Sequence, residues 1–287
     1  MSTVARRTWR CRDHGLEVGR RTLVMCILNV TPDSFSDGGR FLDPGDAVAR
    51  AVHLLDDGAD ILDIGGESTR PGAAAVSVEE ELRRVVPVVQ AMHAARPGVV
   101  ISVDTRRAVV AQAALDAGAA IVNDVSAGAD PDMFDVVGSI GAGMVLMHMR
   151  GAPATMQDDP TYDDVVADVH AFLRERVEAA TSASIGIERL AVDPGIGFGK
   201  DLHHNLALIR SLAGFTELGV VLAVGVSRKR FIGTLTGVDD PTDRVDGSVA
   251  AGVLAAANGA DVVRTHDVRP TVRALAVADA IVREVGR

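Results

Sequence analysis

Short apolar runs recur along this chain and are separated by longer amphipathic stretches. The runs are residues 23–28, 61–64, 99–103, 120–122, 144–147, 190–192, 220–224 and 261–263. Each run has the length and density of a buried strand, and each stretch has the periodicity of a helix. Strands that alternate with helices form parallel β/α units, and eight units predict a closed (β/α)8 barrel before an open sheet.

Four helix-to-strand junctions are spelled alike: GADILDI, GAAIVND, GAGMVLM and GADVVRT. The glycine in each suits the left-handed position that ends a helix, which makes a weak repeat at the level of the β/α unit. No composition shift divides the chain, so we expect one α/β barrel domain, residues 22–287. For residues 1–21 we expect a short N-terminal arm or hairpin across the barrel floor.

Polar residues stand at or just beyond the C-terminal end of every run. They are Asn29, Asp63, Glu67, Asp104, Asn123, His148, Asp193, Ser227, Lys229, Arg264 and His266. In a (β/α)8 barrel these ends open on one rim, where the active sites of this fold lie. A single such residue can equally be the N-cap of the next helix, but helix capping does not explain a polar residue at all eight ends.

The polar residues divide into acceptors and donors. Asp104, Asn123 and Asp193 offer acceptors to a flat heterocycle with amide and amino groups, because a carboxylate can accept two N–H groups side by side. The donors suit a phosphate-type anion, and they are Thr69, Arg70, Ser227, Arg228, Arg264 and His266. Together the two sets predict a heterocyclic substrate that carries a phosphate or diphosphate.

Composition removes several other classes of protein. A net charge of −10 without a long basic run argues against nucleic-acid or anionic-membrane binding. No apolar run reaches the length of a membrane span or signal peptide, so a soluble, cytoplasmic protein is expected. Cys11 and Cys26 occur without a CxxC motif, which argues against a disulfide framework or a zinc site.

Three further features are the two lysines, a glycine-rich segment and one histidine. Lys200 and Lys229 are the only lysines in a chain with 29 basic residues, which suggests that a compact ammonium group is needed there. The segment DPGIGFGK, residues 193–200, is rich in glycine but lacks P-loop spacing. His148 in LMHM is either a ligand or a rim histidine with satisfied hydrogen bonds.

The motifs ILNVTPDSFSDGG, DIGGESTRPGA, SVDT, VNDVS, LMHMRG, DPGIGFGK, GVSRKRFIG and RTHDV occur in this order. Together they resemble the dihydropteroate synthase family from about Leu23 to the C-terminus. The resemblance implies a (β/α)8 barrel that joins 6-hydroxymethyl-7,8-dihydropterin diphosphate to 4-aminobenzoate. Most of the family has glycine where this chain has Cys26, which puts the packing of the first barrel strand in question.

The resemblance also implies roles for individual residues. Asn29 would ligate a Mg²⁺ bound to the diphosphate, and the loops at 31–44 and 67–77 would close over the site. The phosphates would be held by Thr69, Arg264 and His266, and the pterin by Asp104, Asn123, Asp193 and Lys229. The aminobenzoate would lie near Phe35, Arg70, Pro71, Phe198 and Lys229, and the further substrate-binding residues would be Met147, Gly225 and Ser227. The residues with catalytic roles would be Asp104, Asp193, Lys229, Arg264 and His266, and a homodimer is expected.

Two other functions stay open at this point. A pterin-binding methyltransferase uses a similar barrel but needs no diphosphate clamp, so the SRK and RTH motifs count against it. A non-catalytic pterin-binding relative would not need every site residue, yet all are present in this chain.

Overall fold

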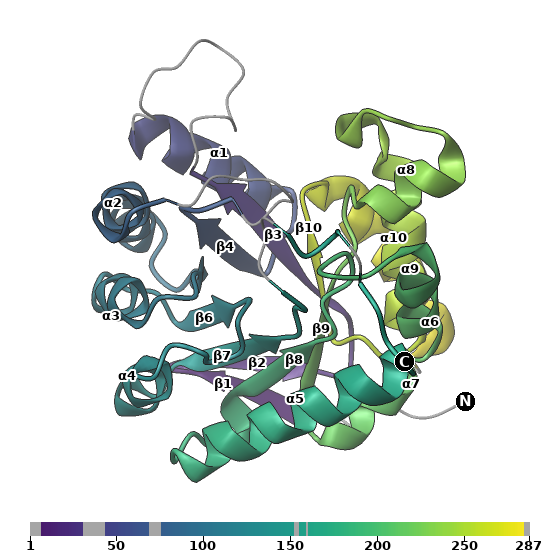
Figure 1. Cartoon of the computed structure of the whole chain (residues 1–287). Helices are drawn as coiled ribbons and strands as arrows, with labels where there is room; N and C mark the ends of the chain where they lie inside the picture. Colours follow the sequence, from purple (N-terminus) through teal and green to yellow (C-terminus); the bar gives the residue numbers. More distant parts are fainter. Residues whose placement is uncertain (1–6, 31–43, 69–75, 152–154, 159, 284–287) are drawn as a thin grey trace.

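The computed structural model describes residues 7–30, 44–68, 76–151, 155–158 and 160–283. Eight parallel strands form a closed barrel, as the alternating pattern predicts (Figure 1). Around the barrel they are β10 (Val262–Thr265), β3 (Leu23–Asn29), β4 (Ile61–Gly65), β5 (Val100–Asp104), β6 (Ile121–Asp124), β7 (Gly143–Met147), β8 (Leu190–Asp193) and β9 (Val221–Gly225). Each strand begins and ends within two residues of its apolar run.

The helices alternate with the strands and surround the barrel. They are α1 (Pro44–Asp56), α2 (Val78–Ala95), α3 (Ala108–Asp116), α4 (Met133–Ile140), α5 (Val165–Ser182), α6 (Leu202–Arg210), α7 (Leu212–Phe215), α8 (Arg230–Thr236), α9 (Val245–Ala257) and α10 (Val268–Val282). Three short 3₁₀ turns are also described: η2 (Ile187–Arg189), η3 (Thr216–Leu218) and η4 (Pro241–Asp243). No helix in the described part of the chain is long and apolar enough to cross a membrane.

The four repeated junctions have the predicted backbone. Gly58, Gly118, Gly141 and Gly259 have φ angles of +105°, +116°, +68° and +101°. An L side chain rarely adopts such angles, so glycine ends the helix here at little cost. The repeated spelling is therefore explained by the turn that leads back into each strand.

The outward side chains of the strands pack against the helices in a continuous apolar layer. Cys26 lies in this layer at 0 % exposure, and β3 pairs with both β10 and β4 alongside it. The packing question raised by Cys26 is thereby answered, because the strand is not interrupted at this position.

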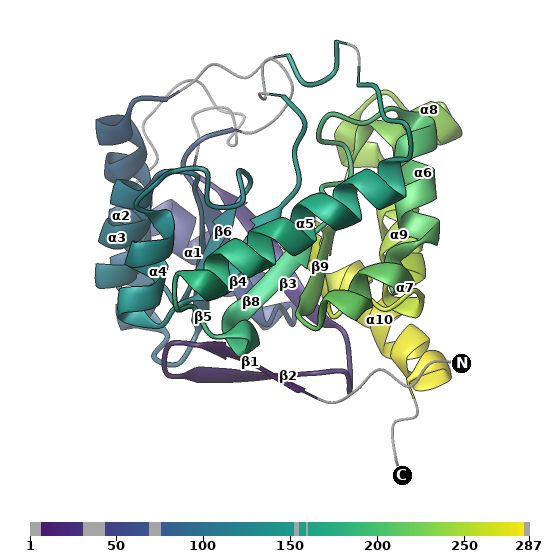
Figure 2. The ribbon, with the colours of Figure 1, turned by 60° about the horizontal axis from the view of Figure 1, so that its bottom comes forward.

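The floor of the barrel is closed by an antiparallel hairpin of β1 (Arg7–Cys11) and β2 (His14–Val18). Figure 2 shows it below the barrel, at the end opposite to α8. Trp9 is fully buried against the lower ends of the strands, and its indole Nε1 donates to Arg189 O at 2.9 Å. Burying a Trp side chain stabilises the fold by ~4 kcal/mol from area alone. A hairpin was one of the two structures expected for residues 1–21, and both of its strands lie within that range.

Candidate active site

The C-terminal ends of the barrel strands surround a cavity of about 670 Å³. Nine of the predicted site residues line it: Asn29, Asp104, Phe198, Gly225, Ser227, Arg228, Lys229, Arg264 and His266. A small recess deeper in the mouth of the barrel shares several of these residues and adds three more predicted ones, Asn123, Met147 and Asp193. The other four, Phe35, Thr69, Arg70 and Pro71, lie outside the described residues. Topology therefore gathers every described member of the predicted set.

The recess contains an ion-pair array centred on Arg264. The guanidinium Nε donates to Asp63 Oδ2 at 2.6 Å, and Nη2 donates to Asp104 Oδ2 at 2.7 Å. Asn123 Nδ2 also donates to Asp63 Oδ2, at 3.1 Å, which leaves the amide oxygen of Asn123 as its acceptor. The second oxygen of Asp63, Oδ1, is buried and has no hydrogen-bond partner in the described part of the chain. The acceptor and donor sets inferred from the sequence thus meet at Arg264.

Burial changes the acidity of these groups. It raises the pKa of Asp104 to about 7, against the opposing effect of Arg264, while the negative charge of Asp63 adds to the increase. Burial acts to lower the pKa of Arg264, but Asp63 and Asp104 outweigh it and raise that pKa. The guanidinium therefore stays charged, and Asp104 titrates near neutral pH.

Asp193 and Lys229 form the opposite wall of the recess. Asp193 Oδ1 accepts from the backbone N–H of Gly195 at 2.7 Å, but burial dominates and raises the pKa of Asp193. Burial likewise lowers the pKa of Lys229 to about 8, with Asp193 opposing it. The Lys229 ammonium lies 4.0 Å from the centre of the Phe198 ring, a cation–π distance. A flat ligand in this recess would meet a carboxylate, an ammonium group and an aromatic face.

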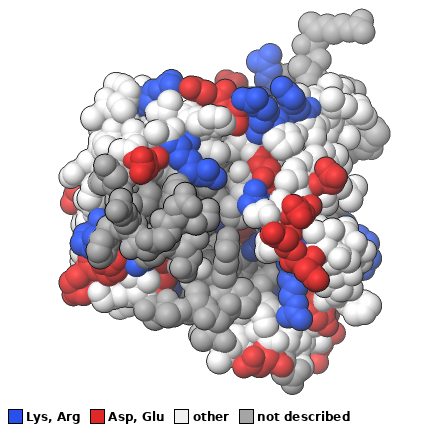
Figure 3. Space-filling view, turned by 90° about the horizontal axis from the view of Figure 1, so that it is seen from above, with Lys and Arg blue, Asp and Glu red and all other residues white. Residues whose placement is uncertain are grey.

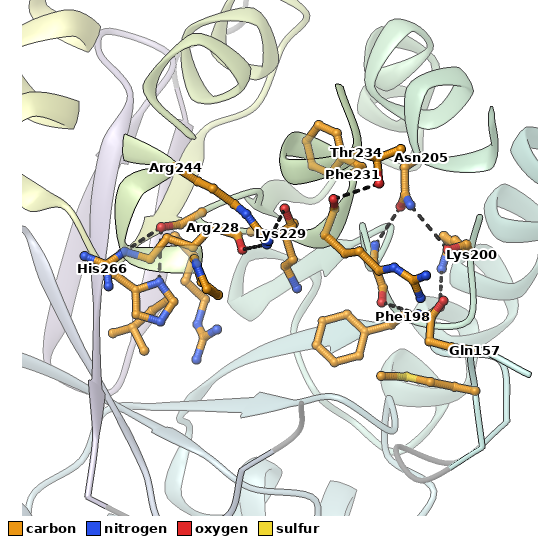
Figure 4. A pocket seen from close by; sticks show the side chains of 18 of the residues that line it. Gln157, Phe198, Lys200, Asn205, Arg228, Lys229, Phe231, Thr234, Arg244 and His266 are labelled. Carbon is orange, nitrogen blue, oxygen red and sulfur yellow. Dashed lines mark hydrogen bonds between the residues drawn. The ribbon is translucent and has the colours of Figure 1, made fainter. Parts of the chain in front are cut away.

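Lys200 has a separate environment behind the glycine-rich segment. Its Nζ lies 2.9 Å from His148 Nδ1 and donates to Phe198 O at 3.0 Å, with only 2 % of the residue exposed. Burial lowers the pKa of Lys200 to about 7, and burial together with Lys200 lowers that of His148 to about 3. His148 is therefore neutral and hydrogen-bonded, and Lys200 holds the backbone next to the site (Figure 4).

The turn after β9 is hydrogen-bonded to the residues that follow β10. Ser227 Oγ accepts from the backbone N–H of His266 at 3.1 Å and lies 3.1 Å from its Nδ1. The Arg228 guanidinium donates to Asp267 through Nε at 3.0 Å and Nη2 at 2.5 Å. Arg228 was expected to face an anion, and the structure directs these two nitrogens to a carboxylate instead.

Asn29 lies where the sequence predicts a magnesium ligand. Its side chain lines the cavity, and Gly65 beside it keeps the space around its Oδ1 open. No cluster of three or more His, Cys, Asp or Glu side chains suited to a metal occurs in the part of the chain described. A single amide oxygen fits an ion that arrives with substrate phosphates, as Mg²⁺ commonly does.

Among the residues at or next to the site that sequence reasoning gave no role are Asp63, Gln157 and Arg244. Asp63 was noted at its strand end but given no role, although it anchors Arg264 and Asn123. Gln157 and Arg244 line the cavity from segments that carry no recognisable motif. The position of Asp63, two residues before Gly65 on an inward face, was the one available signal.

Acidic and basic side chains border one another on the face seen from above, so no large area of one charge is visible among the coloured residues (Figure 3). This arrangement suits a small ligand held in a cavity better than an extended polyanion, which requires a basic surface.

Comparisons with known proteins agree with this site. The profile of the family described as "Pterin binding enzyme" matches residues 25–266. The dihydropteroate synthase of Escherichia coli (strain K12) is 49 % identical over 257 residues, which cover 90 % of this chain and 90 % of that protein. The Xanthomonas albilineans dihydropteroate synthase solved with 4-aminobenzoic acid is 50 % identical, with a TM-score of 0.90 over 96 % of this chain and 98 % of that one.

A second structure of the Xanthomonas albilineans enzyme, in complex with 7,8-dihydropteroate, is 49 % identical, with a TM-score of 0.82 over 91 % of this chain and 94 % of that one. Identity near one half over nine-tenths of both chains is far more than a shared barrel fold alone requires. The chain therefore belongs to the pterin-binding enzyme family and, within it, to the dihydropteroate synthases.

Proposed function

We propose that the chain transfers the pterin methylene of 6-hydroxymethyl-7,8-dihydropterin diphosphate to the amine of 4-aminobenzoate, forming 7,8-dihydropteroate and releasing diphosphate. This alkyl transfer is a step of folate biosynthesis. The observation that carries the proposal is the recess in which Asp104, Asn123, Asp193 and Lys229 surround a space next to the larger cavity. The chain's membership among the dihydropteroate synthases supports the same reaction.

The polar groups that line the recess suit the hydrogen-bonding edge of a pterin ring. The carboxylates of Asp104 and Asp193 and the amide oxygen of Asn123 accept from the ring N–H and amino groups, and Lys229 donates to a ring oxygen or nitrogen. Asp104 accepts fully only when it is ionised, because its protonated form offers one O–H donor in the same place. Binding of the pterin therefore depends on the ionisation of Asp104.

The diphosphate end of the substrate faces the hydrogen-bond donors of the larger cavity, among them Arg264, which lines both the cavity and the recess. Arg264, His266 and Ser227 line the cavity on this side, and their donors stabilise the charge that collects on the departing diphosphate. The reduced pterin delocalises positive charge on the methylene carbon, so departure can precede attack. Asp104 and Asp193 then lie beside the cationic ring and lower its energy.

The second substrate needs positioning more than activation. The aniline nitrogen of 4-aminobenzoate is unprotonated at neutral pH and attacks with its own lone pair, so we assign no general base. The new C–N bond makes this nitrogen strongly acidic, and its extra proton passes to the released diphosphate or to water. Phe198 and Lys229 form the described wall beside this position. The site holds the amine behind the methylene carbon and excludes water, so the cation reacts with the amine.

We propose that Mg²⁺ binds with the diphosphate and that Asn29 supplies the protein ligand through its side-chain oxygen. The ion would neutralise phosphate charge and so improve the leaving group. A homodimer and a cytoplasmic location stay predictions of the sequence.

The test is to incubate the purified chain with both substrates and Mg²⁺ and to search for 7,8-dihydropteroate by mass spectrometry. We expect the product from the parent chain and at least a hundredfold less from Asp193→Asn, in which a donor faces the ring N–H groups. A pterin methyltransferase would instead transfer a methyl group from methyltetrahydrofolate, and a binding paralogue would form neither product. Absence of dihydropteroate with the folded parent would overturn the proposal.

A further inference from the structure

Arg244 lies at the N-terminus of α9 and extends over the short helix α8. Its guanidinium donates to four backbone carbonyls: Val238 O at 2.9 Å, Asp239 O at 2.6 Å, Arg228 O at 3.2 Å and Lys229 O at 3.4 Å. Two of these carbonyls immediately precede α8 and two follow it. No carboxylate pairs with Arg244 in the part of the chain that is described, so its hydrogen bonds go to the backbone at both ends of α8. Figure 4 shows Arg244 beside Arg228 and Lys229.

The backbone at Arg228 needs such support. Arg228 has φ +58°, a left-handed conformation that residues other than glycine rarely adopt. Its backbone N–H donates to Ser248 Oγ at 2.8 Å, and the same hydroxyl donates to Arg244 O at 2.7 Å. Both polar groups of the backbone at Arg228 are thus tied to Arg244, the carbonyl directly and the N–H through Ser248.

The Arg244 guanidinium packs closely against Gly233. A Cβ added to this glycine would lie 2.6 Å from Arg244 Nη2 and 2.6 Å from Val238 O. Glycine inside a helix normally destabilises it relative to alanine, so a close contact is the structural reason for its presence here. The guanidinium occupies the space that a side chain at Gly233 would need.

Lys229 follows the left-handed residue directly. The turn sets its ammonium over the Phe198 ring, and the charged groups that face it are Asp193, Asp104, Arg264 and Lys200. A rotation of the turn by a few tens of degrees would move the far end of this long side chain by several ångströms. The placement of the ammonium therefore depends on the hydrogen bonds made by Arg244 and Ser248.

We propose that Arg244 is a positioning residue for the pterin site, which acts by holding the left-handed turn at Arg228 so that the Lys229 ammonium stays between Asp193 and Phe198. The inference rests on the proposed function only for its ligand. Arg244 touches neither reacting atom in this role.

We call the hydrogen bonds by which Arg244 and Ser248 hold the backbone at Arg228 the Arg244 clamp. Two variants perturb this clamp independently. Arg244→Lys keeps the positive charge but loses the planar fork that reaches four carbonyls. Gly233→Ala leaves Arg244 in the sequence, but the added Cβ would collide with both its guanidinium and the Val238 carbonyl that accepts from it, so this hydrogen bond is disturbed. Gly214→Ala is the matched control, since Gly214 lies in helix α7 and a Cβ there would meet nothing within 4 Å.

The first measurement is calorimetric binding of 6-hydroxymethylpterin. We expect Arg244→Lys and Gly233→Ala each to raise the dissociation constant about tenfold, the factor for one lost hydrogen bond, and Gly214→Ala to leave it unchanged. The second measurement is NMR of chains labelled with ¹³C-lysine, in which Lys200 and Lys229 give two side-chain signals. Lys229→Met assigns the Lys229 signal.

We expect the Lys229 signal to move in both clamp variants and its titration midpoint to rise from about 8 toward the ordinary lysine value, because the ammonium leaves its buried position. A purely structural Arg244 would lower the melting temperature and leave the Lys229 signal in place, which would overturn the proposal. Equal behaviour of Gly233→Ala and Gly214→Ala would overturn it too. The NMR arm needs no ligand, so a parent chain that fails to bind pterin refutes the proposed function and still tests the clamp.

Discussion

Replacing Asp63 by asparagine tests the ion-pair array in the recess. Asp63 is fully buried, and its Oδ2 accepts from both Arg264 Nε and Asn123 Nδ2. Asparagine has nearly the same shape, but its amide has one acceptor oxygen and no charge. The amide oxygen of the variant can take the place of Oδ2 and keep both hydrogen bonds, but the bond to Arg264 loses the carboxylate charge, and the NH₂ group takes the place of Oδ1, which has no partner in the described part of the chain.

The size of the effect follows from the contacts. A hydrogen bond to a charged group is worth ~1.5 to 3 kcal/mol, so we take ~2 kcal/mol for the weakened contact with Arg264. At 1.4 kcal/mol per factor of ten, this loss corresponds to a dissociation constant for the pterin about thirtyfold higher. The pKa of Asp104 should also fall below about 7, because one of the negative charges that raise it is removed.

Calorimetric pterin binding between pH 5 and 9 measures both effects in one series. Affinity should fall about thirtyfold at pH 7.5, and its loss on the acid side should move to lower pH. Ser102→Ala is the control, since Ser102 pairs in register with Asp63, is fully buried, and has an Oγ without a partner in the described part of the chain. The role of Asp63 would be refuted if Asp63→Asn bound the pterin within twofold of the parent and lost affinity at the same acidic pH.

Three further predictions follow from the site. Pterin binding should be bell-shaped in pH: it rises as Asp104 loses its proton near pH 7 and falls as Lys229 loses its proton near pH 8, and a flat calorimetric profile from pH 6 to 9 would contradict this. Gly195→Ala should lower the free energy of unfolding by ~3 kcal/mol or more in urea titrations, because Gly195 has φ +68° and its added Cβ would lie 1.9 Å from His148 O. Asn29→Ala should raise the Mg²⁺ concentration needed for half-maximal turnover about tenfold, and an unchanged Mg²⁺ titration would show that Asn29 only ends its strand.

The barrel could be predicted from the sequence because its signals are local. Apolar runs of strand length, helical periodicity between them and glycine at residues such as Gly58 and Gly118 are each legible within a few positions. The barrel topology then places all strand ends on one rim, so Asp104 and Arg264 could be assigned to one site although they are 160 positions apart. The motifs of the family added the identity of the substrates.

The partners of these residues were decided by the tertiary structure. The pairing of Arg264 with Asp63 and Asp104, the contact of Lys200 with His148, and the direction of Arg228 toward Asp267 each depend on side-chain orientation across the barrel mouth. Arg244 belongs to no recognisable motif, and its proposed role depends on hydrogen bonds to backbone carbonyls on either side of α8. Periodicity records which face of an element is buried, whereas hydrogen bonds between distant segments depend on distances of a few tenths of an ångström that close only when the whole barrel has packed.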